Sequence, residues 1–237
     1  MTQTSKTLLV TGFGPFLQHL VNPSNLAVEH MLAEFTPPEG VKVAALSKLE
    51  VAYAPVRAAL PPAHAHYRPA FTLHVGVGLP GPFQLERYGR NSGHLSFDVR
   101  NEYVNEDVAR DGKATDPKKA RAVDGPNVKD VYETALDLPR MVQALAASSP
   151  SSSPSGKPWA VEVSEDAGGY LCNFTYTNSL ALSEEYAADE TSRYRVLFLH
   201  VPPVGAPYSQ EEIGQFVVNT VAYLCREAVA GEGAYRA

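Results

Sequence analysis

The sequence predicts a three-layer α/β/α domain around a central, mostly parallel β-sheet. Short apolar segments rich in β-branched residues alternate along the chain with segments whose apolar residues recur at helical spacing. The strand segments are apolar on both faces, which is typical of a parallel sheet covered by helices on both sides. A chain of 237 residues can form one such domain, and we expect residues 1–237 to be a single domain.

The elements can be placed from local signals. The segments with the length and composition of buried strands are residues 7–11, 41–49, 71–77, 159–163 and 194–201. Helix starts are marked by Asn22 with Pro23, by Asp137 with Pro139, and by Ser209 with Glu212, which form a capping-box pattern. Flexible loops are expected near residues 103–127, 148–158 and 184–193.

Composition and charge exclude several classes of protein. Hydrophobic residues make up 44% of the chain and charged residues 19%, which excludes a disordered or collagen-like polypeptide. The net charge is −6 and no basic patch stands out, so neither nucleic acid nor a membrane is an expected partner. The apolar run in MTQTSKTLLVTG is too short for a signal peptide or a membrane span, and we expect a cytoplasmic protein.

The stretch GVGLPG, residues 76–81, matches the glycine pattern of dinucleotide-binding loops and follows a predicted strand. That motif needs a helix that begins inside it and meets the pyrophosphate. Here Pro80 and Pro82 flank the third glycine, and no helical period follows. We therefore interpret this segment as a structural or substrate-lining loop.

Histidine spacing indicates no metal site. His64 and His66 lie in AHAHYRP, which we interpret as a proline-flanked loop without a third ligand nearby. His200 differs because it comes near the end of the most apolar strand, and ligands of open α/β sheets bind at the carboxyl ends of strands. A packed core histidine is the alternative for His200.

Two cysteines cannot form a disulfide framework, so each is either buried or functional. Cys172 follows a glycine pair at the predicted first turn of a helix, and a helix N-terminus stabilises a nucleophilic thiolate. Cys225 lies on the last predicted helix without an acid or base partner and is interpreted as structural. A buried structural cysteine is the alternative for Cys172 as well.

A cysteine, a histidine at a strand end and a carboxylate that orients the histidine would form a hydrolase triad. The spacing of the residues does not select the carboxylate. The candidates are Glu86, Asp98, Glu102, Glu165 and Asp166.

Four stretches resemble pyroglutamyl peptidase I, a family of cysteine peptidases that remove N-terminal pyroglutamate from peptides. They are VTGFGPFLQHLVNPSNLAV, HVGVGLPGPFQLERYGRN, SEDAGGYLCNFTYTNSL and FLHVPPVGAPYSQEEIG. The resemblance implies an α/β/α sandwich with a mixed, mostly parallel sheet, as in phosphorylase/hydrolase-like folds. It also implies Glu86 as the catalytic glutamate, Cys172 as the nucleophile and His200 as the catalytic histidine. Asp98 matches a recurring acidic position and is expected to support the structure.

The same resemblance implies a slot for the pyroglutamyl ring. Its expected residues are Phe13, Phe16, Val77, Gly78, Tyr170 and Leu171. Aromatic walls with a few backbone partners can select a flat, uncharged lactam over charged glutamate, whose burial is costly. Without the resemblance, ordinary core filling is the alternative for Phe13 and Phe16.

The implied reaction is attack by a Cys172 thiolate on the pyroglutamyl carbonyl, followed by hydrolysis of the thioester. It requires no metal and no cofactor, and its partners are small peptides with N-terminal pyroglutamate; a homo-oligomer is compatible with the sequence. Two alternatives stay open. One is a cysteine amidase for another small cyclic amide, and the other is a non-catalytic relative that binds N-blocked peptides.

Overall fold

A computed structural model describes residues 5–16, 21–105, 108, 118–126, 128–148, 153–187 and 190–230. Its strands are β1 (Lys6–Phe13), β2 (Val41–Leu49), β3 (Phe71–Val77), β4 (Phe83–Glu86), β5 (Tyr88–Arg90), β6 (Val131–Glu133), β7 (Val161–Ser164) and β8 (Val196–Val201). Its helices are α1 (Pro23–Glu34), α2 (Tyr53–Tyr67), α4 (Leu138–Ala147), α6 (Leu171–Tyr186), the 3-10 turn η1 (Glu190–Ser192) and α7 (Gln210–Ala230).

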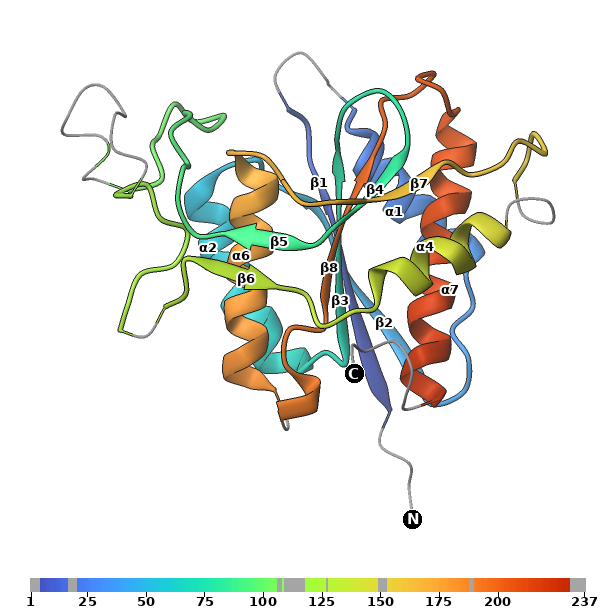
Figure 1. The fold of residues 1–237 in the computed structure, drawn as a ribbon, viewed down its shortest axis with the longest axis horizontal. Helices are drawn as coiled ribbons and strands as arrows, with labels where there is room; N and C mark the ends of the chain where they lie inside the picture. The colour runs from blue at the N-terminus through green and yellow to red at the C-terminus, as the bar shows by residue number, and fades with distance from the viewer. Residues whose placement is uncertain are drawn as a thin grey trace.

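Six strands form the central sheet in the order β2-β1-β3-β8-β4-β7. Neighbouring strands are parallel except β4 and β8, which are antiparallel. Helices α2 and α6 cover one face of the sheet, and α1, α4 and α7 cover the other (Figure 1). The expected three-layer fold with a mixed, mostly parallel sheet is therefore confirmed. Strands β5 and β6 form a separate antiparallel pair.

The helix starts are confirmed together with their capping contacts. The Asn22 side chain accepts a hydrogen bond from the Ser24 amide, and Asp137 caps α4 in the same way. Before α7, the Glu212 amide donates to Ser209 Oγ at 3.2 Å, and the Ser209 amide donates to Glu212 Oε2 at 2.8 Å. This reciprocal pair is the capping box that the sequence predicts.

The expectation that His64 and His66 lie in a loop is wrong, because both lie in the last turns of α2. Pro61 and Pro62 inside this helix obscured the helical period in the sequence, since proline removes intrahelical hydrogen bonds. The helix nevertheless buries one face, which consists of Tyr53, Val56, Leu60, Ala63 and His64. Burial of that face compensates for the weakened backbone ladder.

The predicted strand 159–163 is shifted to β7, and strands β4, β5 and β6 had no counterpart in the prediction because each is only three or four residues long. The loops expected near 103–127, 148–158 and 184–193 are described only in part. Residues 106–107, 109–117, 127, 149–152 and 188–189 lie outside the described residues.

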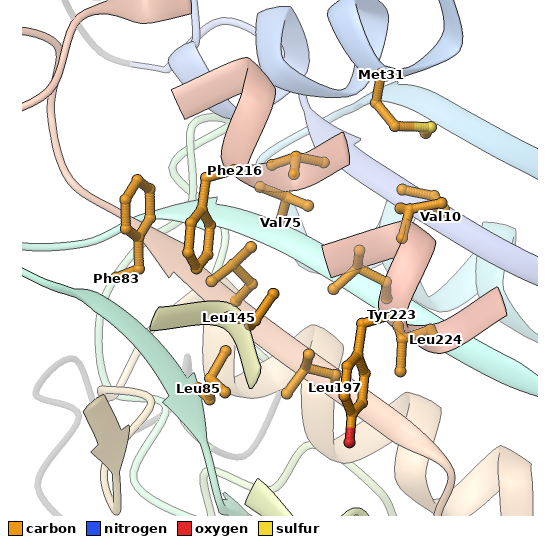
Figure 2. Packing of buried hydrophobic residues seen from close by; sticks show 14 of the residues in the cluster. Val10, Met31, Val75, Phe83, Leu85, Leu145, Leu197, Phe216, Tyr223 and Leu224 are labelled. Atoms are coloured by element: carbon orange, nitrogen blue, oxygen red, sulfur yellow. The ribbon is translucent and has the colours of Figure 1, made fainter. Parts of the chain in front are cut away.

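The core against α1, α4 and α7 is built from aliphatic and aromatic side chains. Phe83 from β4 stacks on Phe216 from α7 (Figure 2), with ring centroids 3.7 Å apart. Trp159 and Tyr208 pack around this pair. Within the described part of the chain, no helix combines the length and apolar character needed to cross a bilayer.

Candidate active site

Strand register brings a histidine and a glutamate together on one face of the sheet. In the antiparallel pair, Gln84 lies opposite His200 and Glu86 lies opposite Phe198, so Glu86 is the diagonal neighbour of His200 on the same face. His200 Nδ1 lies 2.7 Å from Glu86 Oε1. The Glu86 side chain is fully buried, and its second oxygen has no hydrogen-bond partner among the described residues. Among the described residues, the Glu86 carboxylate therefore makes one side-chain hydrogen bond, which is the one with the His200 imidazole.

Cys172 is the second residue of α6 and is half-buried. Burial opposes the charged imidazole of His200, but the charge and hydrogen bond of Cys172 and those of Glu86 outweigh burial and raise the pKa of His200 to about 10. The imidazole therefore holds its proton at neutral pH. A protonated imidazole in turn stabilises a negative charge on the neighbouring sulfur.

The N-terminus of α6 adds to this electrostatic field. Tyr170 is the N-cap residue and makes no capping hydrogen bond with its side chain, and the first intrahelical bond is from the Phe174 amide to the Tyr170 carbonyl. The amides of residues 171–173 therefore have no acceptor within the helix. They form a set of donors beside the sulfur, and the helix dipole favours negative charge there.

Two glycines of the GVGLPG stretch are explained by close packing at this site. A Cβ on Gly76 would lie 2.7 Å from the Phe198 ring and 3.2 Å from Cys172 Sγ, and a Cβ on Gly78 would lie 2.9 Å from His200 Cβ. No helix begins in this loop, since β4 follows it. The geometry of a dinucleotide-binding loop is absent from residues 76–81, and the glycines instead leave space for the thiol and the imidazole.

The six residues expected to form the slot do not have equal exposure. Phe16 and Tyr170 are half-buried with ring centroids 5.7 Å apart, whereas Phe13 is buried against Phe198 at 6.3 Å. Leu171 is also buried. Phe16 and Tyr170 can therefore contact a ligand with their exposed parts, while Phe13 and Leu171 lie in the core behind them.

Val77 and Gly78 are half-buried at the end of β3. The Gly78 amide donates to the Val201 carbonyl at 2.8 Å, and the Gly81 amide donates to the Ala206 carbonyl at 3.0 Å. These two amides are therefore engaged within the fold. The Gly78 carbonyl oxygen is the backbone group of this residue that can accept a hydrogen bond from a ligand N–H.

Tyr170 also contributes a polar group beside the thiol. Burial, with smaller contributions from Asp98 and Cys172, raises the pKa of Tyr170 to about 12. The phenol consequently keeps its proton and remains a hydrogen-bond donor near the sulfur.

The other four candidate carboxylates do not bond to His200. Asp98 accepts hydrogen bonds from the amides of Tyr53, Arg100 and Glu102. Glu165 lies 3.8 Å from Arg87, and Asp166 accepts a hydrogen bond from the Gly168 amide.

Asp98 instead caps helix α2 from a distant loop. The Tyr53 amide, which donates to Asp98, is the first amide of α2, and the N-cap residue of this helix makes no capping bond with its side chain. This contact agrees with the expected supporting role of Asp98.

Sequence reasoning missed the role of Phe198. Its ring lies 4.8 Å from the ring of His200 and 6.1 Å from that of His74, beneath the site. The alternation in RVLFLHV places Phe198 and His200 on the same face of β8, and this signal could have identified it. Within the described ranges, no group of three or more His, Cys, Asp or Glu side chains gathers as metal ligands.

A thiol at a helix N-terminus, beside an imidazole that bonds to a buried carboxylate, is typical of cysteine-dependent hydrolases. A family model described as pyroglutamyl peptidase matches residues 6–215, and the chain belongs to this family of cysteine peptidases. Human and rat pyroglutamyl-peptidase 1 are each 30% identical to it over 216 residues, which cover 91% of this chain and 88% of the relative.

Solved structures of the family share the fold. The pyroglutamyl peptidase I of Bacillus amyloliquefaciens superposes with a TM-score of 0.70 at 20% identity, over 94% of this chain and 98% of that chain. The pyrrolidone carboxyl peptidase of Thermococcus litoralis gives a TM-score of 0.73 at 17% identity, over 98% and 99% of the two chains. The likeness extends over almost the whole of each chain.

Proposed function

We propose that this protein removes N-terminal pyroglutamate from peptides, with Cys172 as nucleophile, His200 as acid and base, and Glu86 as the group that orients the imidazole. The observation that carries the proposal is the 2.7 Å contact between Glu86 and His200 beside the Cys172 thiol, in a chain of the pyroglutamyl peptidase family. In this arrangement the Glu86 carboxylate bonds to the His200 imidazole, and the imidazole in turn interacts with the Cys172 sulfur.

In the first half of the reaction, the Cys172 thiolate attacks the carbonyl carbon that joins the pyroglutamyl residue to the next residue, and an S–C bond forms. The protonated His200 gives its proton to the departing amine as the C–N bond breaks, and a thioester remains. The free amides at the start of α6 bind the oxyanion that develops on the carbonyl oxygen; each well-placed donor contributes about 3 kcal/mol of transition-state stabilisation.

In the second half, water attacks the thioester while the now neutral His200 accepts its proton. Pyroglutamate leaves, and the proton and the thiolate are restored to their starting positions. Throughout the cycle Glu86 keeps Nδ1 of the imidazole as a donor, so that Nε2 faces the reacting groups. No metal or cofactor enters either half.

Recognition of the ring follows from the exposed parts of Phe16 and Tyr170, whose rings lie 5.7 Å apart and together can form one apolar wall against a flat lactam. Carbonyl groups at the end of β3, such as that of Gly78, can accept the single lactam N–H. The six residues expected to form the slot carry no positive charge that could compensate a free glutamate side chain, so desolvation disfavours the open-chain form.

The proposal is tested by release of the fluorophore from pyroglutamyl-aminomethylcoumarin under reducing conditions. We expect Cys172→Ala to reduce kcat/KM by about 10³-fold or more. Cys225→Ala, at the buried cysteine of α7, is the matched control and should retain turnover. Unchanged turnover in Cys172→Ala would exclude the proposed nucleophile. A well-folded parent that binds blocked peptides without turnover would indicate a non-catalytic relative.

We further propose a cytoplasmic protein that acts on small peptides. Cys172 and Cys225 are both free thiols, as expected in a reducing compartment, and the net charge of −6 does not favour anionic polymers or membranes. Fractionation of the source cells tests the location. Sedimentation of the purified chain tests whether the active form is a homo-oligomer.

A further inference from the structure

Asn173, the residue after Cys172, joins α6 to β5 through its side-chain amide. Asn173 Nδ2 donates to the Arg90 carbonyl at 2.8 Å, and the Arg90 amide donates to Asn173 Oδ1 at 2.8 Å. The Asn173 side chain is buried. The amide thus takes the place of a neighbouring strand, because it satisfies both backbone polar groups of one residue.

Two further contacts come from the same face of α6, three and four residues later. Tyr176 Oη donates to the Glu86 carbonyl at 2.8 Å, and Thr177 Oγ1 donates to the Arg90 carbonyl at 3.2 Å. A Cβ on Gly89 would lie 2.8 Å from Thr177 Oγ1, so glycine permits the helix to approach the strand. Residues 86–90 are therefore attached to α6 over two successive turns.

These contacts connect the two ends of the candidate triad. Glu86 ends β4 and bonds to His200, while Cys172 precedes Asn173 in the first turn of α6. Any shift of α6 along or away from β5 would move the sulfur relative to the imidazole, which Glu86 holds in place.

We propose that Asn173 is a positioning residue, whose paired hydrogen bonds to Arg90 fix Cys172 at the distance from His200 that the reaction requires. This inference rests on the proposed function. A purely structural role is the alternative, in which the apolar side of α6, including Leu171, Phe174 and Leu180, suffices to place the helix.

The chemistry of the contact specifies an amide. Arg90 presents one donor and one acceptor, and asparagine offers the complementary pair. Aspartate can still accept from the Arg90 amide, but it places a second oxygen against the Arg90 carbonyl. Asn173→Asp should therefore keep one hydrogen bond and Asn173→Ala neither, which gives a graded series.

The first readout is steady-state kinetics on pyroglutamyl-aminomethylcoumarin. We expect Asn173→Ala to lower kcat by about 10- to 100-fold with little change in KM, because a small displacement affects the reacting atoms more than ring binding. Asn173→Asp should fall between Asn173→Ala and the parent. Asn178→Ala is the matched control, because Asn178 on the same helix donates to the Phe174 carbonyl within that helix and, among the described residues, to no strand. It should retain the parent kcat.

The second readout needs no substrate, namely the pH dependence of Cys172 alkylation by iodoacetamide in a Cys225→Ala background. At pH 6 we expect alkylation of Asn173→Ala to be about ten-fold slower than that of the parent, because the sulfur no longer lies against the protonated imidazole. Asn178→Ala should follow the parent curve.

The outcomes separate the two proposals. Asn173 variants that lose thermal stability but keep the parent kcat and alkylation profile would overturn the positioning role. If Asn173→Ala does not fold, Asn173→Asp decides by the same two readouts. A parent without turnover would overturn the proposed function, whereas a shifted alkylation profile in the variants would still support the positioning role.

Discussion

The two faces of the central sheet have different compositions, although helices bury both. On the face toward α1, α4 and α7, the strands present Leu, Val and Phe side chains. On the face toward α2 and α6, the same strands place their polar and small residues, namely Thr11, Thr72, His74, Gly76, Glu86 and His200. The first face therefore supplies packing alone, whereas the second combines apolar strand residues such as Phe13, Val196 and Phe198 with oriented polar groups.

One sheet can thus be both a stable core and a scaffold for polar side chains. Alternate residues of a strand point to opposite faces, so each strand contributes to both. In FTLHVGV, Phe71, Leu73 and Val75 lie in the apolar core, while His74 bonds to Thr11 on the other face and a Cβ on Gly76 would lie 3.2 Å from Cys172 Sγ. Substitutions on the two faces should consequently affect different measured quantities.

The largest effect on the polar face is expected for Glu86→Gln. It should reduce kcat/KM by about 10²- to 10³-fold, because the amide no longer stabilises the protonated imidazole. Loss of the carboxylate should also lower the pKa of His200, since Glu86 is one of the groups that raise it. Kinetics as a function of pH measure both. Glu162→Gln, at an exposed glutamate of the neighbouring strand β7, is the control, and an equal loss in both variants would contradict the assignment.

On the apolar face, Phe216→Ala should destabilise the fold by about 3–5 kcal/mol, because it opens a cavity beside the stacked Phe83 ring. The kcat of the folded fraction should remain close to that of the parent. Urea unfolding followed by fluorescence gives the free energy of unfolding. Val229→Ala, at an exposed position of the same helix, should change it by less than about 0.5 kcal/mol. A large fall in kcat of folded Phe216→Ala would show that the two faces are not separable.

A smaller effect is expected in the slot. Phe16→Ala should raise KM for the pyroglutamyl substrate by about 10-fold, because a half-buried ring contributes roughly 1–2 kcal/mol of contact. Phe97→Ala removes an exposed aromatic ring that stacks on Tyr103, and it should leave KM unchanged. Equal KM values for Phe16→Ala and the parent would exclude Phe16 from the slot.

The effect that is smallest near neutral pH, and grows only in acid, concerns the stability of the polar face. Burial lowers the pKa of His64 to about 4, and burial together with His64 lowers that of His74 to about 3, against about 6.5 in the unfolded chain. Between these folded-state values and pH 6.5, the unfolded state binds more protons than the folded state. The contribution of these histidines to the free energy of unfolding is therefore fully present above pH 6.5 and declines as pH falls toward 4. Each histidine contributes up to about 1.4 kcal/mol per pH unit.

The acid effect can be assigned to one histidine by comparing His64→Gln with His66→Gln. His64 is buried and its Nε2 lies 2.7 Å from Ser179 Oγ, whereas His66 is exposed two residues later on α2. The slope of unfolding free energy against pH should decrease in His64→Gln and remain as in the parent in His66→Gln. Equal slopes in all three proteins would indicate that other groups cause the acid dependence.

Much of the fold follows from patterns that are local in the sequence. The capping residues Asn22, Asp137 and Ser209 predict helix starts correctly, because the capping contacts involve neighbours three residues away or closer. Helix α2 was missed because its prolines conceal an amphipathic period, and its cap, Asp98, lies 45 residues from the Tyr53 amide. Long-range capping leaves no local signal.

The candidate site could be predicted from the sequence only in part, for the same reason. The placement of Cys172 at a helix start and His200 near a strand end could be predicted from the residues, but the choice of Glu86 came from family resemblance. It depends on β4 running antiparallel to β8, and four residues of sequence do not indicate this direction. The Arg90 contact of Asn173 likewise joins segments 83 residues apart.

In the proposed reaction, Cys172 carries a covalent acyl intermediate, and His200 and Glu86 assist both its formation and its hydrolysis. Rapid acid quench of the enzyme with a pyroglutamyl peptide, followed by mass spectrometry of the proteolytic fragments, tests it most directly. We predict a pyroglutamyl thioester on the fragment that contains Cys172, formed before steady state and absent from Cys172→Ala. Turnover without this adduct, or with the acyl group on another residue, would contradict the account.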